Sequence, residues 1–238
     1  MEGRNRTISL LYEAAVNPSL WPRALAAFAD LTQYPEIIIT VHDKIPGTKR
    51  GNLRLFMSAG RICTPESNRA YGTHYYSVDP LRESKAFETP TGTILLCQDY
   101  VPEKIVARSE FYQDYLLPLG GRYLGGWMLV NDERLVSSLV LHARDAPFER
   151  KKVERWGFMA QHARQAVSLS LQLAERMSQA HMLRQAINNA GLVCVMVDGN
   201  SKLIDCSAAA TALLERGGSL KVHIGGRLAT DSETATKR

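Results

Sequence analysis

The chain has 238 residues, of which 45% are hydrophobic and 22% are charged, a balance typical of a water-soluble globular protein. No uncharged apolar run approaches the roughly 20 residues that a membrane-spanning helix needs, and the N-terminus lacks the apolar core of a secretory signal. The four cysteines are scattered without a Cys-x-x-Cys pair. We therefore expect reduced thiols and a cytoplasmic protein that does not contact a membrane.

The net charge of +5 comes mostly from one segment. Residues 148–190 carry 7 basic and 3 acidic side chains, whereas residues 1–147 carry 16 of each. The basic residues are densest at Arg150, Lys151, Lys152 and Arg155. A nucleic-acid reader combines such a cluster with a reading motif, and the sequence has none. We therefore interpret the cluster as a solvated helix start in preference to a phosphate contact.

Several helices are expected in residues 1–147. Thr7, Ser19 and Ser109 stand where a polar side chain caps the start of a helix, and Pro22 suits a first helical turn. The expected helices cover residues 7–16, 19–32 and 64–75, a short segment from Pro102, and residues 110–116.

Five segments have the β-branched, apolar character of strands. They are residues 37–42, 52–58, 92–97, 127–130 and 135–142, and the last two form a hairpin. The strands do not alternate regularly with helices. We therefore predict an α+β domain over residues 1–147, in which helices pack against an antiparallel sheet that holds a pocket on one face.

One long helix is predicted from Phe148 to about residue 190, since the segment has no proline and one isolated glycine. Its apolar residues form two offset stripes at steps of three and four, the spacing of a coiled coil or of a helix lying on a core. The first stripe is Val153, Trp156, Ala160, Ala163, Val167, Leu171, Ala174 and Met177, and the second is Leu169, Leu173, Ala180, Leu183 and Ile187. We expect one stripe to face its own domain and the other to join a second copy in a homodimer.

Residues 191–230 are expected to form a separate small unit. The predicted order is a strand, a tight turn, a strand, a helix and two short strands, over residues 191–197, 198–200, 201–205, 207–216, 220–224 and 227–230. So short a segment buries only a small core, which indicates an incomplete unit. Residues 231–238 are small and polar, and we expect them to be disordered.

Three segments carry a pattern found in a known family. They are residues 11–22 (LYEAAVNPSLWP), 75–80 (YYSVDP) and 108–120 (RSEFYQDYLLPLG). Together they resemble the sensory region of bacterial LuxR-type helix-turn-helix regulators, and residues 191–210 are similar to the first hairpin and helix of a PAS-type sensor. The resemblance implies a sensor domain shaped like a GAF or PAS domain. Nothing resembling a helix-turn-helix follows Gly225-Gly226, so we expect DNA contact only through a domain that this chain lacks.

Tyr75, Tyr76 and Asp79 are the first candidates for ligand contact. They resemble the part of quorum-sensing autoinducer-binding domains where an aromatic group and an aspartate hold an acylated lactone, although no tryptophan precedes Asp79 as it usually does there. A buried carboxylate accepts a proton from a ligand amide, while tyrosines supply apolar walls with a polar tip. Further aromatic candidates are Tyr112, Tyr123 and Trp127. The alternatives are a turn cap for Asp79 and core packing for the aromatic residues.

No catalytic or metal-binding constellation is evident. The six histidines never take a metal-binding spacing, Ser109 has no Gly-x-Ser-x-Gly elbow around it, and there is no Walker loop. We therefore expect neither an enzyme nor a metal site, and the cofactor is unknown. The favoured hypothesis is a dimeric module that senses a small-molecule effector for a LuxR-like regulator. The alternatives are a protein-interaction scaffold with a self-filled pocket and, third, an enzyme of unrecognised type.

Overall fold

The computed structural model describes residues 2–45, 51–60, 63–218 and 220–230, so the predicted disordered tail lies outside the described residues. Contacts divide the chain into two compact units, residues 1–171 and residues 172–238. The dividing point falls inside the long helix, not at residues 147 or 190, where the sequence suggested boundaries. The division of the chain that the sequence predicted stays a prediction.

The first unit is built on a five-stranded antiparallel sheet, which confirms the predicted α+β class. Its strands are β1 (Glu36–Lys44), β2 (Gly51–Gly60), β3 (Ile94–Leu96), β4 (Tyr123–Asn131) and β5 (Leu135–Ala143). The strand order is β2-β1-β5-β4-β3, so β5 lies in the middle, paired with β1 and β4. All five expected strands are present.

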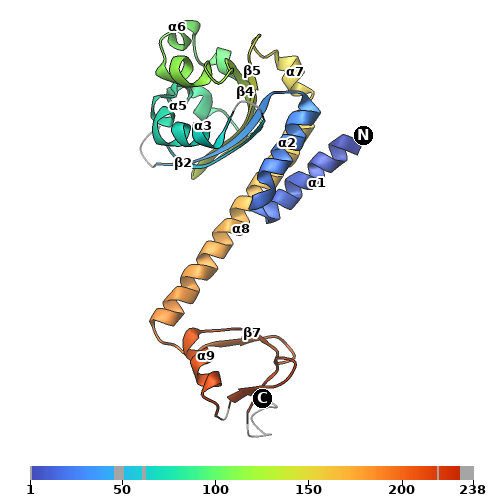
Figure 1. The fold of residues 1–238 in the computed structure, drawn as a ribbon, viewed down its shortest axis with the longest axis vertical. Coiled ribbons are helices and arrows are strands. Elements are labelled where there is room, and N and C mark those ends of the chain that lie inside the picture. Colours follow the sequence, from blue (N-terminus) through green and yellow to red (C-terminus); the bar gives the residue numbers. More distant parts are fainter. Residues whose placement is uncertain (1, 46–50, 61–62, 219, 231–238) are drawn as a thin grey trace. The chain divides into compact units, whose positions relative to one another are not determined.

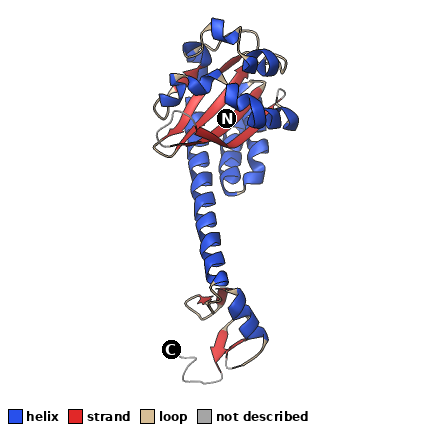
Figure 2. Ribbon diagram, turned by 90° about the vertical axis from the view of Figure 1, so that its left-hand side faces the viewer, coloured by secondary structure: helices blue, strands red, loops and turns tan. Residues whose placement is uncertain are grey.

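One face of the sheet carries a helical core. Helices α1 (Glu2–Val16) and α2 (Trp21–Thr32), the short helix α7 (Arg150–Glu154) and the first part of α8 (Gly157–Asn189) provide it. Figure 1 shows these helices on one side of the sheet, and Figure 2 shows the strands of the sheet among the helices that surround it. Their buried side chains meet Ile37, Ile39, Leu139 and Leu141 of the strands. This apolar contact is where most of the hydrophobic stabilisation of the unit arises.

The other face is covered by short helical segments that join the strands. They are α3 (Pro65–Ala70), η2 (Tyr71–Tyr75), α4 (Tyr76–Val78), α5 (Pro80–Glu83), η3 (Lys85–Glu88), η4 (Cys97–Asp99), α6 (Glu103–Val106) and η5 (Phe111–Leu116). We call this layer the cover. Thr64 caps α3 as its sequence suggests, since its side chain accepts a hydrogen bond from the Ser67 backbone at 3.2 Å. The segments η2 and η5 are π-helical turns, a form often found at functional sites.

Three predicted helix caps are wrong. Helix α1 begins at Glu2, so Thr7 lies inside it and its hydroxyl donates to the Gly3 carbonyl, a bond that an interior threonine makes readily. Asn17, not Ser19, caps the short turn η1 (Pro18–Leu20) that leads into α2. The η5 turn has no side-chain cap, so Ser109 does not cap it.

The long helix is interrupted near its start. Phe148 lies outside any helix, α7 ends at Glu154, and α8 begins at Gly157. The first predicted stripe is buried in the unit's own core only as far as Val167, while Leu169 of the second stripe is 36% exposed. Towards its end the first stripe is exposed as well, with Met177 73% exposed. The expected division of the two stripes between the domain and a second copy stays a prediction.

The second unit consists of the last part of α8 and two hairpins with a short helix between them. Strands β6 (Val195–Val197) and β7 (Leu203–Cys206) precede α9 (Ala208–Glu215), which β8 (Leu220–Val222) and β9 (Leu228–Thr230) follow. Among its described apolar residues only Ala210 is buried. The order of elements matches the expectation, and the core among the described residues is small, as expected of so short a segment. That the unit is incomplete stays a prediction.

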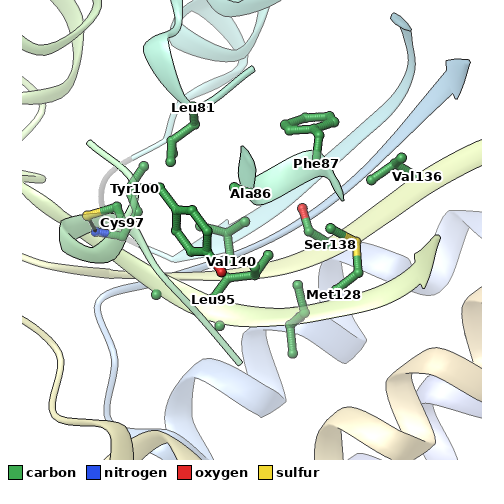
Figure 3. A pocket seen from close by; sticks show the side chains of 14 residues that line it. Leu81, Ala86, Phe87, Leu95, Cys97, Tyr100, Met128, Val136, Ser138 and Val140 are labelled. Atoms are coloured by element: carbon green, nitrogen blue, oxygen red, sulfur yellow. Dashed lines mark hydrogen bonds between the residues drawn. The ribbon is translucent and has the colours of Figure 1, made fainter. Parts of the chain in front are cut away.

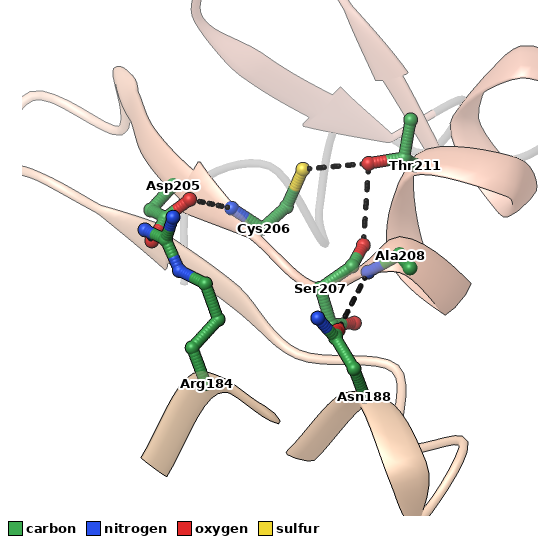
Figure 4. A network of polar contacts seen from close by, with 7 residues as sticks. All are labelled: Arg184, Asn188, Asp205, Cys206, Ser207, Ala208 and Thr211. Atoms are coloured by element: carbon green, nitrogen blue, oxygen red, sulfur yellow. Dashed lines mark hydrogen bonds and ion pairs between the residues drawn. The ribbon is translucent and has the colours of Figure 1, made fainter. Parts of the chain in front are cut away.

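Polar contacts join the end of α8 to the rest of this second unit (Figure 4). Arg184 forms an ion pair with Asp205 of β7, and Asn188 Oδ1 accepts the Ala208 backbone N–H at 2.9 Å. Ser207 caps α9 and also donates to the Leu192 carbonyl at 2.7 Å. The last turns of α8, the first hairpin and α9 are thus linked directly.

Candidate ligand cavity

Two cavities lie side by side between the cover and the sheet. The polar chamber has a volume of about 80 Å³ and its walls include Thr40, His42, Tyr71, Asp79 and His142. The apolar chamber has a volume of about 70 Å³ and its walls include Leu95, Met128, Gly126, Val136 and Ala86. Each is several times the space of roughly 10–15 Å³ that one water needs. Figure 3 shows the cover side chains above the strands that floor the apolar chamber.

Asp79 is the buried carboxyl group of the polar chamber. The Asp79-Pro80 sequence starts α5, where Asp79 Oδ1 accepts the Leu81 backbone N–H at 2.9 Å. Its other oxygen accepts the Tyr71 hydroxyl at 2.9 Å. Burial raises the pKa of Asp79 to about 6, although these two hydrogen bonds and the Arg82 guanidinium oppose the increase. The group therefore acts both as the predicted turn cap and as a wall of the cavity.

Two buried histidines stand on the sheet side of the polar chamber. His42 contacts the Tyr76 hydroxyl through Nδ1 at 3.0 Å, and the two rings stack. Burial lowers the pKa of His42 to about 3 and that of His142 to about 4, so both are neutral at pH 7. His142 Nδ1 has no hydrogen-bond partner among the described residues. A buried polar atom of this kind costs free energy unless something binds it.

A pair of hydroxyl groups completes the polar side chains that line this chamber. Thr40 and Ser138 lie on neighbouring strands and their oxygens are 2.8 Å apart. Since only one of the two hydroxyls donates to the other, the pair retains one donor for a further partner. The polar chamber thus offers a carboxyl acceptor, a hydroxyl donor and neutral imidazoles within otherwise apolar walls.

The apolar chamber presents few polar atoms. The side chains around it are aliphatic or aromatic apart from Ser138, Cys97 and Tyr100. Burial raises the pKa of the Cys97 thiol, which accepts the Leu124 N–H at 3.1 Å. Gly126 has no room for a side chain because a Cβ there would lie 1.9 Å from the Leu139 carbonyl oxygen. This chamber suits an apolar group.

The six predicted site residues are found in different places. Asp79 lines the polar chamber, Tyr76 contacts the lining residue His42, and Tyr75 stacks on Tyr115. Tyr112 is fully buried in the core beneath the cover. Tyr123 and Trp127 belong instead to the core on the helical face. Ligand contact by these six residues stays a prediction.

Sequence reasoning missed Thr40, His42 and His142. A signal was present, because Thr40 and His42 alternate with Ile39 and Val41 along β1. Polar residues at every second position of an otherwise apolar strand indicate that the second face is a site. Tyr71 was also missed, since its role depends on a fold that brings its hydroxyl to Asp79.

Among the described residues, no three histidine, cysteine, aspartate or glutamate side chains gather where a metal ion would bind. None of the described helices is both long and apolar enough to cross a bilayer.

In the basic cluster, Arg150 forms an ion pair with Asp99 at 3.1 Å and Lys152 forms one with Glu149 at 2.6 Å. These contacts partly neutralise the cluster.

The fold is similar to that of known regulatory domains. No protein-family model and no curated protein matches the chain. Among solved structures, the VqsR LBD domain from Pseudomonas aeruginosa matches with a TM-score of 0.53 at 16% identity, over 71% of this chain and 96% of that one. The N-acylhomoserine lactone dependent LuxR family transcription factor CepR2 from Burkholderia cenocepacia matches with a TM-score of 0.50 at 13% identity, over 72% of this chain and 99% of that one. At this identity the similarity establishes the fold.

The buried groups predict how stability depends on pH. Between pH 6 and 4 each buried histidine is neutral in the native state but protonated when unfolded, because its ordinary pKa is 6.5. Asp79 behaves oppositely, since its pKa rises from 3.8 to about 6 on folding. Summed over these three groups, the unfolded chain thus binds one more proton than the native protein does. Acidification through this window should lower the free energy of unfolding by about 1.4 kcal/mol per pH unit.

The substitution His142→Leu should remove the proton that His142 takes up when the chain unfolds. In urea unfolding measured from pH 6 to pH 4, we expect the variant's slope with pH to be smaller than that of the unmodified protein by about 1.4 kcal/mol per unit. The same substitution at the exposed His181 is the control. Parallel curves for His142→Leu and the unmodified protein would show that His142 is not buried in a neutral form.

Proposed function

We propose that the chain is the sensory region of a LuxR-type transcriptional regulator, acting in the cytoplasm, and that the paired chambers bind its small-molecule effector. The observation that carries this proposal is the cavity beneath the cover, where Asp79 and Tyr71 form a buried hydrogen-bonded pair. Concave, mostly apolar sites with a few convergent polar groups are typical of ligand pockets. The similarity to the VqsR and CepR2 folds supports the same assignment.

The chamber walls favour a neutral, amphiphilic effector. Its polar head would donate a hydrogen bond to Asp79 and accept one from the Thr40 and Ser138 pair. An anionic head would lie beside the Asp79 carboxyl group, neutral imidazoles and largely apolar surface, where an unpaired charge is costly. Since CepR2 depends on an N-acylhomoserine lactone, such lactones are the first compounds to test.

Strand β5 provides a physical route from the cavity to α8. Ser138 and Val140 line the chambers, while Leu139 and Leu141 belong to the same apolar core as the first turns of α8. Interiors are close-packed, so a ligand that displaces β5 also repacks the helix contact. A ligand can favour one packing of α8 over another by its different affinity for the two.

We further propose that α8 joins two copies of the chain, and that DNA is contacted by a separate domain. The second stripe supports a dimer, since Leu169 and Leu183 are 36% and 65% exposed. The ion pairs of Arg150 and Lys152 favour a solvated role for the basic cluster. The scaffold alternative requires a self-filled pocket, which the two chambers disfavour.

The effector site is tested by binding of N-acylhomoserine lactones of several chain lengths in isothermal titration calorimetry. For a lactone that binds, Tyr71→Phe should weaken affinity about five- to tenfold, because it removes the hydroxyl that orients Asp79. The matched control is Tyr34→Phe, since Tyr34 packs on Phe148 on the helical side of the sheet. Equal loss in both variants, or none in Tyr71→Phe, contradicts the assignment. Absence of binding by all lactones excludes that class and leaves other neutral amphiphiles to test.

The dimer is tested by replacing Leu169 and Leu173 with glutamate. We expect this double variant to be a folded monomer in light scattering, because two carboxylates cannot be buried in an apolar seam. Ser178→Glu with Gln185→Glu adds the same charge on the opposite face of α8 and should remain dimeric. An unmodified protein that is already monomeric at tens of micromolar contradicts the dimer.

A further inference from the structure

The polar and apolar chambers share one wall. Its residues are Leu81 and Phe87 from the cover, and Leu124, Ser138 and Val140 from the sheet. Figure 3 shows the cover side chains Leu81 and Phe87 above Ser138 and Val140 of β5. Phe87 is the largest side chain of this wall. Its ring is therefore the bulkiest group that borders both chambers.

The backbone of Phe87 is held firmly. Asn131, at the end of β4, donates from Nδ2 to the Phe87 carbonyl at 2.9 Å and to the Thr89 carbonyl at 2.7 Å. Ser84 caps the η3 turn by accepting the Ala86 N–H at 3.1 Å. The Phe87 ring also packs edge-on against His42, with centroids 5.0 Å apart. The backbone hydrogen bonds and the ring contact with His42 together keep the Phe87 ring where the two chambers meet.

We propose that Phe87 is the specificity-determining residue of this cavity, because its ring limits the apolar length of a ligand whose polar head lies beside Asp79. The proposal rests on the effector site described above. It assigns to that site neutral amphiphiles with short apolar tails. A tail that reaches the ring cannot continue into the apolar chamber, although that chamber has the lining to receive it.

Each methylene group that enters apolar space raises affinity about fourfold. For a series with one head group, affinity should therefore rise with tail length and stop rising where the tail meets Phe87. Removing the ring would join the chambers, and the rise would continue across about three further methylene groups. The longest members should then bind Phe87→Ala at least about tenfold more tightly than the unmodified protein.

The test is isothermal titration calorimetry with N-alkylacetamides from ethyl to octyl, whose N–H and C=O match the donors and acceptors of the polar chamber. Phe56→Ala is the matched control, since Phe56 is also half-buried but lines only the polar chamber. We expect affinity for Phe87→Ala to keep rising with longer tails than it does for the unmodified protein. For Phe56→Ala, the tail length at which affinity stops rising, its end point, should be unchanged. Phe87→Leu, which removes less volume, should give an intermediate end point and guards against poor folding of the alanine variant.

The outcomes separate this inference from the proposed function. If the unmodified protein binds the short amides and all variants share its end point, the role of Phe87 is refuted while the effector site stands. An extension as large in Phe56→Ala as in Phe87→Ala also refutes it. If none of the proteins binds any member of the series, the site for neutral amphiphiles fails and the role of Phe87 fails with it.

Discussion

Strand β5 separates two chemically different environments because its successive side chains point to opposite faces of the sheet. Leu139 and Leu141 enter the helical core, whereas Ser138, Val140 and His142 face the cover. Pairing with β1 and β4 on both sides fixes this register. A slip of one residue would place polar groups in the core and leucines in the cavity, so it is strongly disfavoured.

The cavity retains polar groups that a purely structural core would exclude. Asp79 is compensated by the Tyr71 hydroxyl and the Leu81 N–H, while His142 Nδ1 has no partner in the described part of the chain. A buried polar atom without a hydrogen-bond partner costs stability, and such atoms are expected at binding sites. The helical face has a different role, since its close-packed side chains stabilise the unit and connect β5 with α8.

The sequence was sufficient for features that local pattern determines. The strands followed from β-branched runs, and the burial of the first stripe as far as Val167 followed from its helical spacing. Long-range pairing was not predictable, which is why the contact of Tyr71 with Asp79 was missed and why the sequence did not place Trp127 in the core on the helical face. The Thr7 cap failed because the helix continues for a full turn before it, where no strong start signal stands.

The structure places a partly apolar cavity on the β5 face beneath the cover. A crystal of the protein pressurised with xenon tests it most directly, because xenon occupies dry apolar cavities. We predict a xenon atom in the apolar chamber, between Met128 and the cover residue Leu81, and ordered water beside Thr40 and Ser138 in the polar chamber. Side chains closely packed through both chambers, with no xenon bound there, would contradict the account.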